Sequence, residues 1–459
     1  MPLLDSGVIN PFGPTQDASA LAQAQSDQFI GQDYTTKTSL TSVDGSASRK
    51  IAQLPTGPLR LAVGAELRRE TYDYSPATVL QEGNVGGLGG NSLPESASRT
   101  AQAAYFELNG YLLHSLQGDI AVRWDHYQAV GSTVNPQLWL HWKPLHWLQL
   151  RGSAGTGFRA PSLPDLYAPQ TFSVTSNGTR DPLQCPVFNP NNPACSEQFT
   201  TVTGGNPNLQ PEKSVNYTLG AVFQPTEGLR LDLDSFWIYL RNEIAGGGLP
   251  YSVILQNAQT ANEFSRFVTR DSSGNIVSIS QTAANLFKTY LSGLDINLSY
   301  DKRVGPGAVF VQANGAYFYK YAVQNYNGTW TDVVNQGLSS VGEAGGVIIR
   351  WRHTLTLGYR TDSWELSVTQ NYQEPYRDTP STVTQVPRDV SAYDTINTQA
   401  SYSGLRHFDF TIGVINLFNQ NPPYTNYGSI ANNFVGGYDL TYGDPRGRYV
   451  YATVRYHLH

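Results

Sequence analysis

Apolar and polar residues alternate along much of this chain. Between 229 and 234 every odd position is Leu and every even position is Arg or Asp. The same alternation returns at 294–300, 364–369 and 408–414. Successive side chains of a β-strand point to opposite faces, so a period of two predicts strands with one apolar and one polar face.

The alternation, together with the turn residues that interrupt it, predicts about fifteen strands. Single-chain bacterial membrane barrels have an even number of strands, so an odd count leads us to expect that further strands belong to the same wall. The predicted strands are 33–54, 58–74, 99–113, 117–129, 132–143, 146–157, 212–224, 228–241, 287–301, 306–321, 348–360, 363–375, 391–403, 406–418 and 446–458.

The connections between these strands fall into a short set and a long set. Aromatic residues border the short set: Trp142 and Trp147 flank one turn, and Tyr359 and Trp364 flank another. Aromatic rings are favoured where hydrocarbon meets lipid headgroups. We therefore predict an all-β fold, an antiparallel transmembrane β-barrel with an aromatic girdle at its short-turn end. The long connections are 158–211, 242–286, 322–347 and 420–445.

The composition agrees with a strand-and-turn protein in a membrane. Only 14% of the residues are charged, against roughly 25% in soluble globular proteins, and 28 are tyrosine. The mean hydropathy of -0.34 and the lack of any apolar run of about 18 residues exclude helical membrane spans. A net charge of -6 without a basic stripe argues against nucleic-acid binding.

The two cysteines, Cys185 and Cys195, lie close together in one long connection. A disulfide between them would close a loop and would suit an oxidising, extracytoplasmic site; two unpaired loop thiols are the alternative. Neither has a Cys or His neighbour at zinc-ligand spacing, so we expect no metal. The N-terminus lacks the features of a signal peptide. Either the chain is cytoplasmic or its start is not the natural one.

Four segments resemble the TonB-dependent outer-membrane receptor family. They are Gly-Phe-Arg-Ala-Pro at 157–161, Gly-Asn-Pro-Asn-Leu-Gln-Pro-Glu at 205–212, Ile-Asn-Leu-Phe-Asn at 415–419 and Gly-Asp-Pro-Arg-Gly-Arg-Tyr at 443–449. Each is weak alone, but their order and spacing also fit, over about 150–459. One departure is the final residue, which is His459 where family members usually have Phe.

The resemblance implies a 22-strand barrel around an N-terminal plug. Counted back from the C-terminus, the fifteen predicted strands would be strands 8–22 of that barrel. Residues 1–32 would then be an extracellular loop remnant, and 33–459 would be the C-terminal part of the barrel domain. The plug, and the TonB box that precedes it, would be missing from this sequence.

The resemblance also implies the function. Family members carry out energy-coupled uptake of a bulky nutrient (a ferric siderophore, cobalamin or an oligosaccharide) across the bacterial outer membrane, and the TonB–ExbB–ExbD system acts on the full-length protein. We expect contact with outer-membrane lipid, no catalysis and no cofactor. A passive porin-like channel is the main alternative. An outer-membrane hydrolase using His126 or His353, and a soluble all-β binding protein, are the others.

Ligand contacts should come from long loops on a rigid wall. Aromatic and amide side chains suit hydroxylated ligands, although they suit packing between loops equally well. Gly152, Gly155 and Gly157 do not form a phosphate-binding loop, since no helix and no acidic partner follow them. We expect Glu212 to be solvated or to face the plug. The candidate ligand-binding residues are Arg159, for which a structural role is the alternative, and Tyr326, Trp330, Tyr424 and Tyr427.

Overall fold

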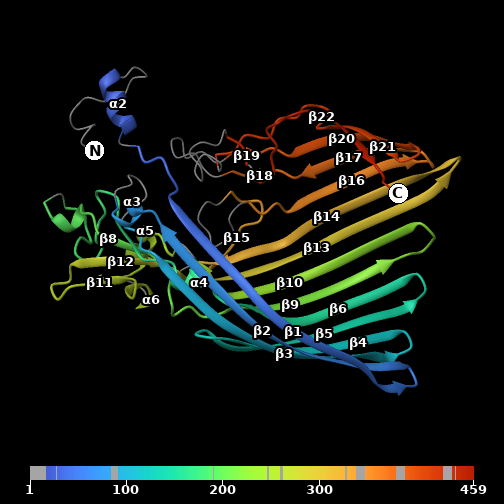
Figure 1. The fold of residues 1–459 in the computed structure, drawn as a ribbon, viewed down its shortest axis with the longest axis horizontal. Coiled ribbons are helices and arrows are strands. Elements are labelled where there is room, and N and C mark those ends of the chain that lie inside the picture. The colour runs from blue at the N-terminus through green and yellow to red at the C-terminus, as the bar shows by residue number, and fades with distance from the viewer. Residues whose placement is uncertain are drawn as a thin grey trace.

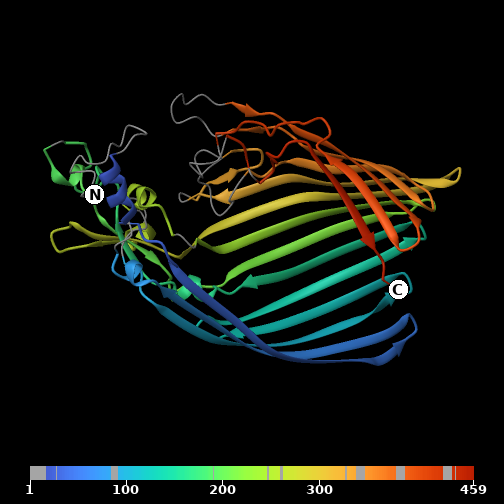
Figure 2. The same ribbon diagram turned by 45° about the horizontal axis from the view of Figure 1, so that its top comes forward.

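A computed structural model of the chain has one large sheet with a smaller folded unit at one end (Figure 1). Both views show the large sheet curved into a trough, with the N-terminus at the end that bears the smaller unit (Figures 1 and 2). The structure describes residues 17–26, 28–83, 91–189, 191–245, 248–258, 262–325, 328–337, 347–378, 388–426, 437–439 and 441–458.

Fifteen strands cross the large sheet in chain order, and each pairs antiparallel with its neighbours. Each matches one stretch predicted from the alternation, with ends that differ by a few residues. The strands are β1 (Tyr34–Leu54), β2 (Gly57–Pro76), β3 (Glu95–Leu113), β4 (Leu116–Tyr127), β5 (Gly131–Leu145), β6 (Leu148–Arg159), β9 (Glu212–Phe223), β10 (Leu229–Ala245), β13 (Ala284–Val304), β14 (Gly307–Gln324), β16 (Trp351–Arg360), β17 (Trp364–Gln373), β20 (Tyr393–Leu405), β21 (Phe408–Ile415) and β22 (Tyr449–Tyr456). The short β15 (Trp330–Asp332) pairs with β14 beside this path.

The two ends of the sheet differ in the way that the sequence predicts. Short turns join the strands at the right-hand end of Figure 1, and the long connections lie at the left-hand end. A short turn can only join neighbouring antiparallel strands, so these turns determine the simple strand order. The short turns are 55–56, 114–115, 146–147, 224–228, 305–306, 361–363 and 406–407.

One face of the sheet is polar, and we call it the lumen face. On it, Arg123 bridges Glu66 at 2.8 Å and Asp125 at 2.9 Å. Further along, the Arg151 Nε donates to an Asp234 carboxylate oxygen at 2.7 Å. The Arg123–Glu66 pair joins β4 to β2 across β3, and the Arg151–Asp234 pair joins β6 to β10 across β9. The lumen face lines the inside of the trough.

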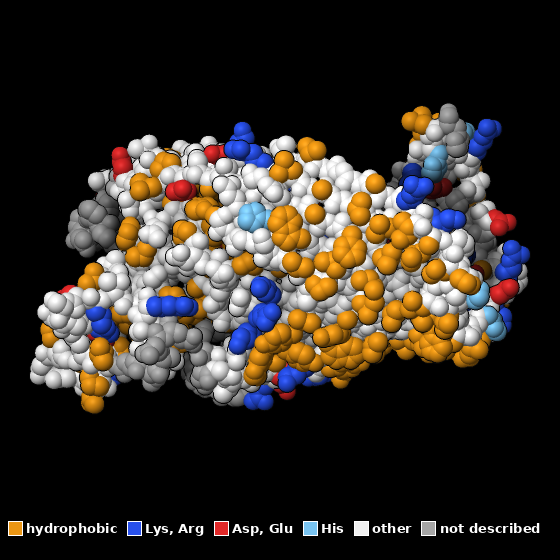
Figure 3. Space-filling model, turned by 90° about the horizontal axis from the view of Figure 1, so that it is seen from below, with side chains coloured by type: hydrophobic (Ala, Val, Ile, Leu, Met, Phe, Trp, Pro, Cys, Tyr) orange, Lys and Arg blue, Asp and Glu red, His pale blue; other side chains and the backbone are white. Residues whose placement is uncertain are grey.

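The opposite, outer face is apolar and exposed. Hydrophobic side chains gather over the strands on the outside of the trough (Figure 3). A soluble monomer rarely exposes so continuous an apolar surface, whereas a membrane wall requires one. Exposed members of this face include Val63, Leu67, Ile120, Leu138, Leu219, Leu357, Leu366 and Ile412.

Aromatic side chains border the apolar face at both ends. At the short-turn end the rings of Trp364 and Tyr402 lie 4.7 Å apart. At the long-connection end His353 stacks on Tyr372 at 5.2 Å. Tyr372 is eight residues from Trp364, about 26 Å along the strand, which suits the apolar band of a membrane barrel. The sequence predicted only the first girdle. The second was not predicted because its residues stand beside long connections without a turn motif to mark them.

Two long connections fold together into a unit that we call the loop subdomain, within 163–211 and 248–283. Its sheet has the order β11 (Val268–Arg270), β12 (Ile276–Thr282), β8 (Thr200–Gly204) and β7 (Thr171–Val174), and β8 and β12 are parallel. Its core includes Phe199, Ile254 and Ile279 and continues onto Phe287 of the wall strand β13. We had expected only loops here; the core shows that these connections bury enough apolar surface to fold.

Short helices complete the described residues. They are α2 (Ala18–Ser26), α3 (Thr78–Gln81), α4 (Leu163–Tyr167), α5 (Tyr251–Asn257), α6 (Asn262–Ser265) and the 3-10 turn η1 (Pro193–Cys195), with β18 (Tyr376–Arg377) pairing β19 (Asp389–Val390). The sequence did not predict α2 in the segment before the first strand. Within the described ranges, no helix is long and apolar enough to cross a membrane.

The strand path starts at β1 and stops at β22, and among the described residues no ladder joins these two strands. Nearly all side chains of β1 are exposed. Each of the two strands therefore pairs on one side only, which leaves a row of backbone N–H and C=O groups on the other.

Candidate ligand-binding site

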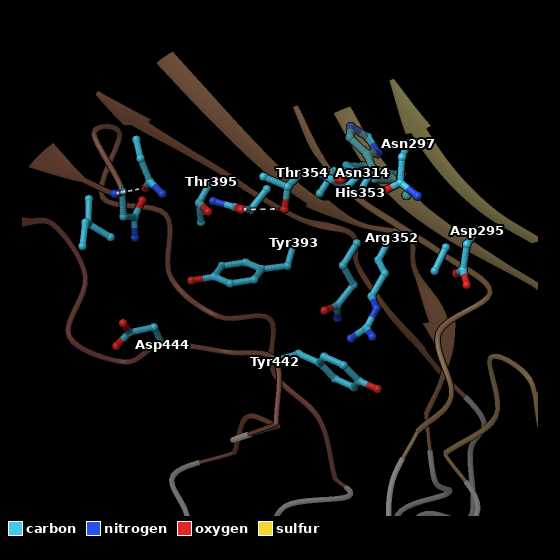
Figure 4. A pocket seen from close by; sticks show the side chains of 18 of the residues that line it. Asp295, Asn297, Asn314, Arg352, His353, Thr354, Tyr393, Thr395, Tyr442 and Asp444 are labelled. Carbon is cyan, nitrogen blue, oxygen red and sulfur yellow. Dashed lines mark hydrogen bonds between the residues drawn. The ribbon is translucent and has the colours of Figure 1, made fainter. Parts of the chain in front are cut away.

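A cavity of about 710 Å³ lies on the lumen face, toward the long-connection end of the sheet. Wall strands β13, β14, β16, β17 and β20 form its floor, and Tyr442 and Asp444 from the connection between β21 and β22 stand over it (Figure 4). The volume lies within the range of about 300–1,000 Å³ that is typical of small-molecule sites.

The floor consists of two adjacent rows of side chains that run across five strands. Strand register sets both rows, because partner residues on neighbouring strands point to the same face. The first row is Asn297, Asn314, Thr354, Asn371 and Thr395. The second row is Asp295, Ala316, Arg352, Gln373 and Tyr393.

Much of the hydrogen-bonding capacity of the floor is unused within the molecule. Thr354 Oγ1 donates to Asn371 Oδ1 at 3.1 Å, one of the few bonds within the rows. Among the described residues, five other floor side chains that line the cavity make no side-chain hydrogen bond. These five are Asn297, Asn314, Arg352, Gln373 and Thr395.

The turn at 415–419 places the roof over the floor. Asn416 and Asn419 both have positive φ, 53° and 56°, a conformation that Asn tolerates better than most residues. The Asn416 backbone N–H donates to Asn397 Oδ1 at 2.8 Å, and Asn419 Oδ1 accepts the Arg448 N–H at 2.8 Å. The turn thus ties the end of β21 to β20 and to the approach of β22, which determines where the connection between them lies.

Two of the tyrosines that line the cavity, Tyr393 and Tyr442, are held in place. The Tyr442 hydroxyl donates to the backbone carbonyl of Val347 at 2.6 Å. Tyr393 is buried, with 8% of its surface exposed, and its ring stands beside Arg352 and Tyr442 in Figure 4. Fixed rings beside amide groups offer both a stacking surface and hydrogen bonds to a ligand.

The charges around the cavity balance. Arg352 is the Lys or Arg side chain among its lining residues, and it lies within ion-pair distance of no described carboxylate. Asp295 stands on the same row, two strands away. The second carboxylate, Asp444, is bound by Arg446 at 2.7 Å. That guanidinium lowers the pKa of Asp444 and keeps it ionised. Amide and hydroxyl groups, rather than net charge, therefore dominate this surface.

Arg159, a predicted ligand-binding residue, lies outside this cavity. Its guanidinium binds both carboxylate oxygens of Glu212 at 2.6 Å and approaches Asp165 at 3.6 Å. Glu212 also accepts the Ile244 N–H at 2.8 Å. The Glu212 carboxylate is paired rather than simply solvated, because Arg159 lies opposite it on the neighbouring strand. The other expectation, that Glu212 faces the plug, stays a prediction. This arrangement favours the structural alternative for Arg159, and ligand contact through it stays a prediction.

The predicted aromatic residues are not gathered at the cavity. Trp330 lies 6.4 Å from the ring of Tyr239. Tyr424 lies under the guanidinium of Arg388, at 4.5 Å. Neither lines the cavity. Tyr326 and Tyr427 fall outside the described residues. A role for these residues in binding stays a prediction, and the contacts of Trp330 and Tyr424 are those of packing within the loops.

Cys185 and Cys195 form a disulfide, with their Cα atoms 5.3 Å apart. The bond closes a loop within the loop subdomain, away from the cavity. His126 and His353, considered for hydrolysis, are on the wall: His126 stacks on Trp124 with ring centroids 6.1 Å apart, and His353 stacks on Tyr372.

The residues of the cavity floor were not identified from the sequence. A signal was present, because Asn297, Asn314 and Asn371 all occupy polar positions of alternating strands. Recognising the rows requires the register between strands. The tight turn at 305–306 sets Asn297 opposite Asn314, but long connections separate β14 from β16 and β17 from β20, so their offsets cannot be counted along the sequence. Sequence reasoning therefore pointed to the loops, whereas the structure locates the polar cluster on the wall.

Comparison with known proteins agrees with the family resemblance found in the sequence. The family model described as "TonB dependent receptor-like, beta-barrel" matches residues 6–417. The "Iron-regulated outer membrane virulence protein" of Vibrio cholerae is 23% identical over 230 residues, which are 50% of this chain and 30% of that protein.

Two solved structures have the same fold. A ferric enterobactin receptor variant of Pseudomonas aeruginosa, in complex with enterobactin, matches with a TM-score of 0.66 and 19% identity, covering 92% of this chain and 54% of that one. The siderophore receptor PirA of Acinetobacter baumannii matches with a TM-score of 0.63 and 16% identity, covering 92% and 55%. The chain thus spans about half the length of these solved relatives and less than a third of the curated one.

Proposed function

Because this chain belongs to the TonB-dependent receptor family and lies in the bacterial outer membrane, we propose that it forms wall strands of a receptor for active uptake of a bulky nutrient. The family consists of receptors and transporters, not enzymes. The full-length receptor would bind its ligand from outside, and the TonB–ExbB–ExbD system would supply the energy for passage.

The observation that carries this proposal is the position of the cavity. Its polar floor lies on the lumen face of a wall whose other face is apolar, nearer the long-connection end of the strands. A ligand captured there would already be inside the wall and shielded from lipid. The names of the relatives support a ferric siderophore as one class of cargo.

A passive porin-like channel is the competing function, and dependence on energy separates the two. The gene for the full-length receptor would be expressed in cells with and without TonB, under iron limitation and on an oligosaccharide as carbon source. We expect uptake of a labelled cargo that falls to background without TonB. Uptake that is unchanged without TonB, together with steady conductance in a planar bilayer, would support the channel instead.

A further inference from the structure

We infer that the lumen cavity binds an uncharged, oxygen-rich ligand in preference to an anionic chelate. This inference rests on the proposed function and specifies the surface chemistry of its cargo. Two kinds of molecule share that chemistry: a neutral ferric trihydroxamate and a neutral oligosaccharide. Both present many hydroxyl or carbonyl oxygens without a net charge.

The first argument is the kind of group on the floor. Side-chain amides of Asn297, Asn314 and Gln373 each offer donors and an acceptor, and the described residues use none of them. A surface that both donates and accepts hydrogen bonds is complementary to hydroxyl and amide groups, which do the same. A multiply charged anion, by contrast, needs donors and cations around it and is repelled by acceptors.

The second argument is charge. A ligand that enters a cavity of about 710 Å³ loses part of its hydration, and an anion then requires opposite charge to compensate. Arg352 is the cation on the described floor, and the Asp295 carboxylate shares its row. Arg446 is already bound to Asp444 at 2.7 Å. A trianionic ferric tris-catecholate would find one guanidinium and a nearby carboxylate, which is too little compensation.

The third argument is the pair of rings. Tyr393, at the end of the second row, and Tyr442, above the floor, both line the cavity, and Figure 4 shows Arg352 beside them. Flat aromatic faces beside amide groups suit the C–H faces and hydroxyl edges of sugars and the alkyl chains and carbonyl groups of hydroxamates. Recognition of this kind requires no charge on the ligand.

The test is binding to the chain coexpressed with the part of the receptor that precedes these strands and purified in detergent micelles, followed by tyrosine and tryptophan fluorescence. The probes are a neutral ferric trihydroxamate, a neutral malto-oligosaccharide and a ferric tris-catecholate of similar size. We expect one neutral probe to bind at least about tenfold more tightly than the tris-catecholate. Which of the two binds shows whether the ligand is a ferric trihydroxamate or an oligosaccharide.

Lysine variants test whether the charge of the cavity floor determines which ligand binds more tightly. Asn314→Lys adds a cation to the floor and should shift the ratio of the two dissociation constants toward the tris-catecholate by about tenfold. Asn297→Lys, on the neighbouring strand, should do the same and serves as a second variant in case the first fails to fold. Ser367→Lys is the matched control, since Ser367 is on the lumen face but lies four residues from Asn371, about 13 Å away.

Tighter binding of the tris-catecholate to the unmodified chain would overturn the inference, as would failure of both neutral probes to bind. An equal shift in the Ser367→Lys control would also contradict it, because the effect would then not belong to the cavity. None of these results affects the proposed function, which depends on whether uptake by the full-length receptor requires TonB.

Discussion

Asp181 joins the two halves of the loop subdomain. Its side chain is only 2% exposed, and both of its oxygens accept from the Arg270 guanidinium, at 2.6 and 2.9 Å. It also accepts the Leu183 N–H at 3.0 Å. Asp181 precedes the disulfide loop, whereas Arg270 is at the end of β11. The buried pair therefore holds together two connections that are far apart in sequence.

We predict that Asp181→Ala selectively loosens this subdomain. Removing one partner of a buried ion pair leaves the other charge uncompensated, which costs about 3 kcal/mol. Hydrogen exchange should accelerate in 171–204 and 268–282 and stay unchanged in the wall strands. Arg180→Ala, at the exposed neighbouring position, is the control. Unchanged exchange in Asp181→Ala would show that the disulfide and the apolar core suffice without the pair.

At the scale of strands, glycine and aromatic residues pair across the wall. Gly64 lies opposite Tyr105, Gly358 opposite Phe310, and Gly413 opposite Tyr451. In each pair the aromatic ring lies over the glycine and occupies the space that a Cβ would need. Such pairs recover buried surface that a glycine alone would lose in a strand.

We predict that Gly358→Ala destabilises the wall. The new Cβ would collide with the ring of Phe310 and would lie 2.8 Å from the backbone oxygen of Leu366. Overpacking of this kind costs about 2 kcal/mol. The urea midpoint of the folded, heat-modifiable gel band, for the chain coexpressed with the preceding part of the receptor, measures the loss. In the control Gly45→Ala, the added Cβ has nothing within 4 Å, so the midpoint should stay the same. Equal midpoints for both variants would contradict the prediction.

At the scale of the whole molecule, the two outer strands of the sheet determine how it can exist in a membrane. Within the part of the chain that the structure describes, β1 pairs only with β2, and β22 pairs only with β21. In lipid an unpaired backbone group costs several kcal/mol, because no water is present to replace the missing strand. Soluble proteins tolerate such edges, whereas a membrane wall has to close or pair them.

We predict that the sheet needs complementing strands to fold stably in a bilayer. The chain alone, mixed with lipid vesicles, should aggregate or close into a smaller barrel. Coexpression with the part of the receptor that precedes these strands should restore a protease-resistant, heat-modifiable form. A stable, protease-resistant monomer with fifteen wall strands, obtained without that partner, would show that the two unpaired edges do not destabilise the sheet in a bilayer.

The sequence by itself determined the wall. The fifteen strands, their antiparallel order and the side of the short turns follow from local alternation and turn chemistry, both of which act within about ten residues. The segment at 415–419 likewise marked the end of a strand, because Asn416 and Asn419 adopt a backbone conformation that few residues tolerate.

Only the tertiary structure decided which side chains meet. Asn297 and Thr395 belong to one row because four ladders align them, and each ladder adds its own offset. Arg159 meets Glu212, and Asp181 meets Arg270, across more than fifty residues of chain. Alternation predicts which face of the sheet a side chain occupies. The site also depends on how far each strand is shifted along its neighbour, and a period of two does not determine that shift.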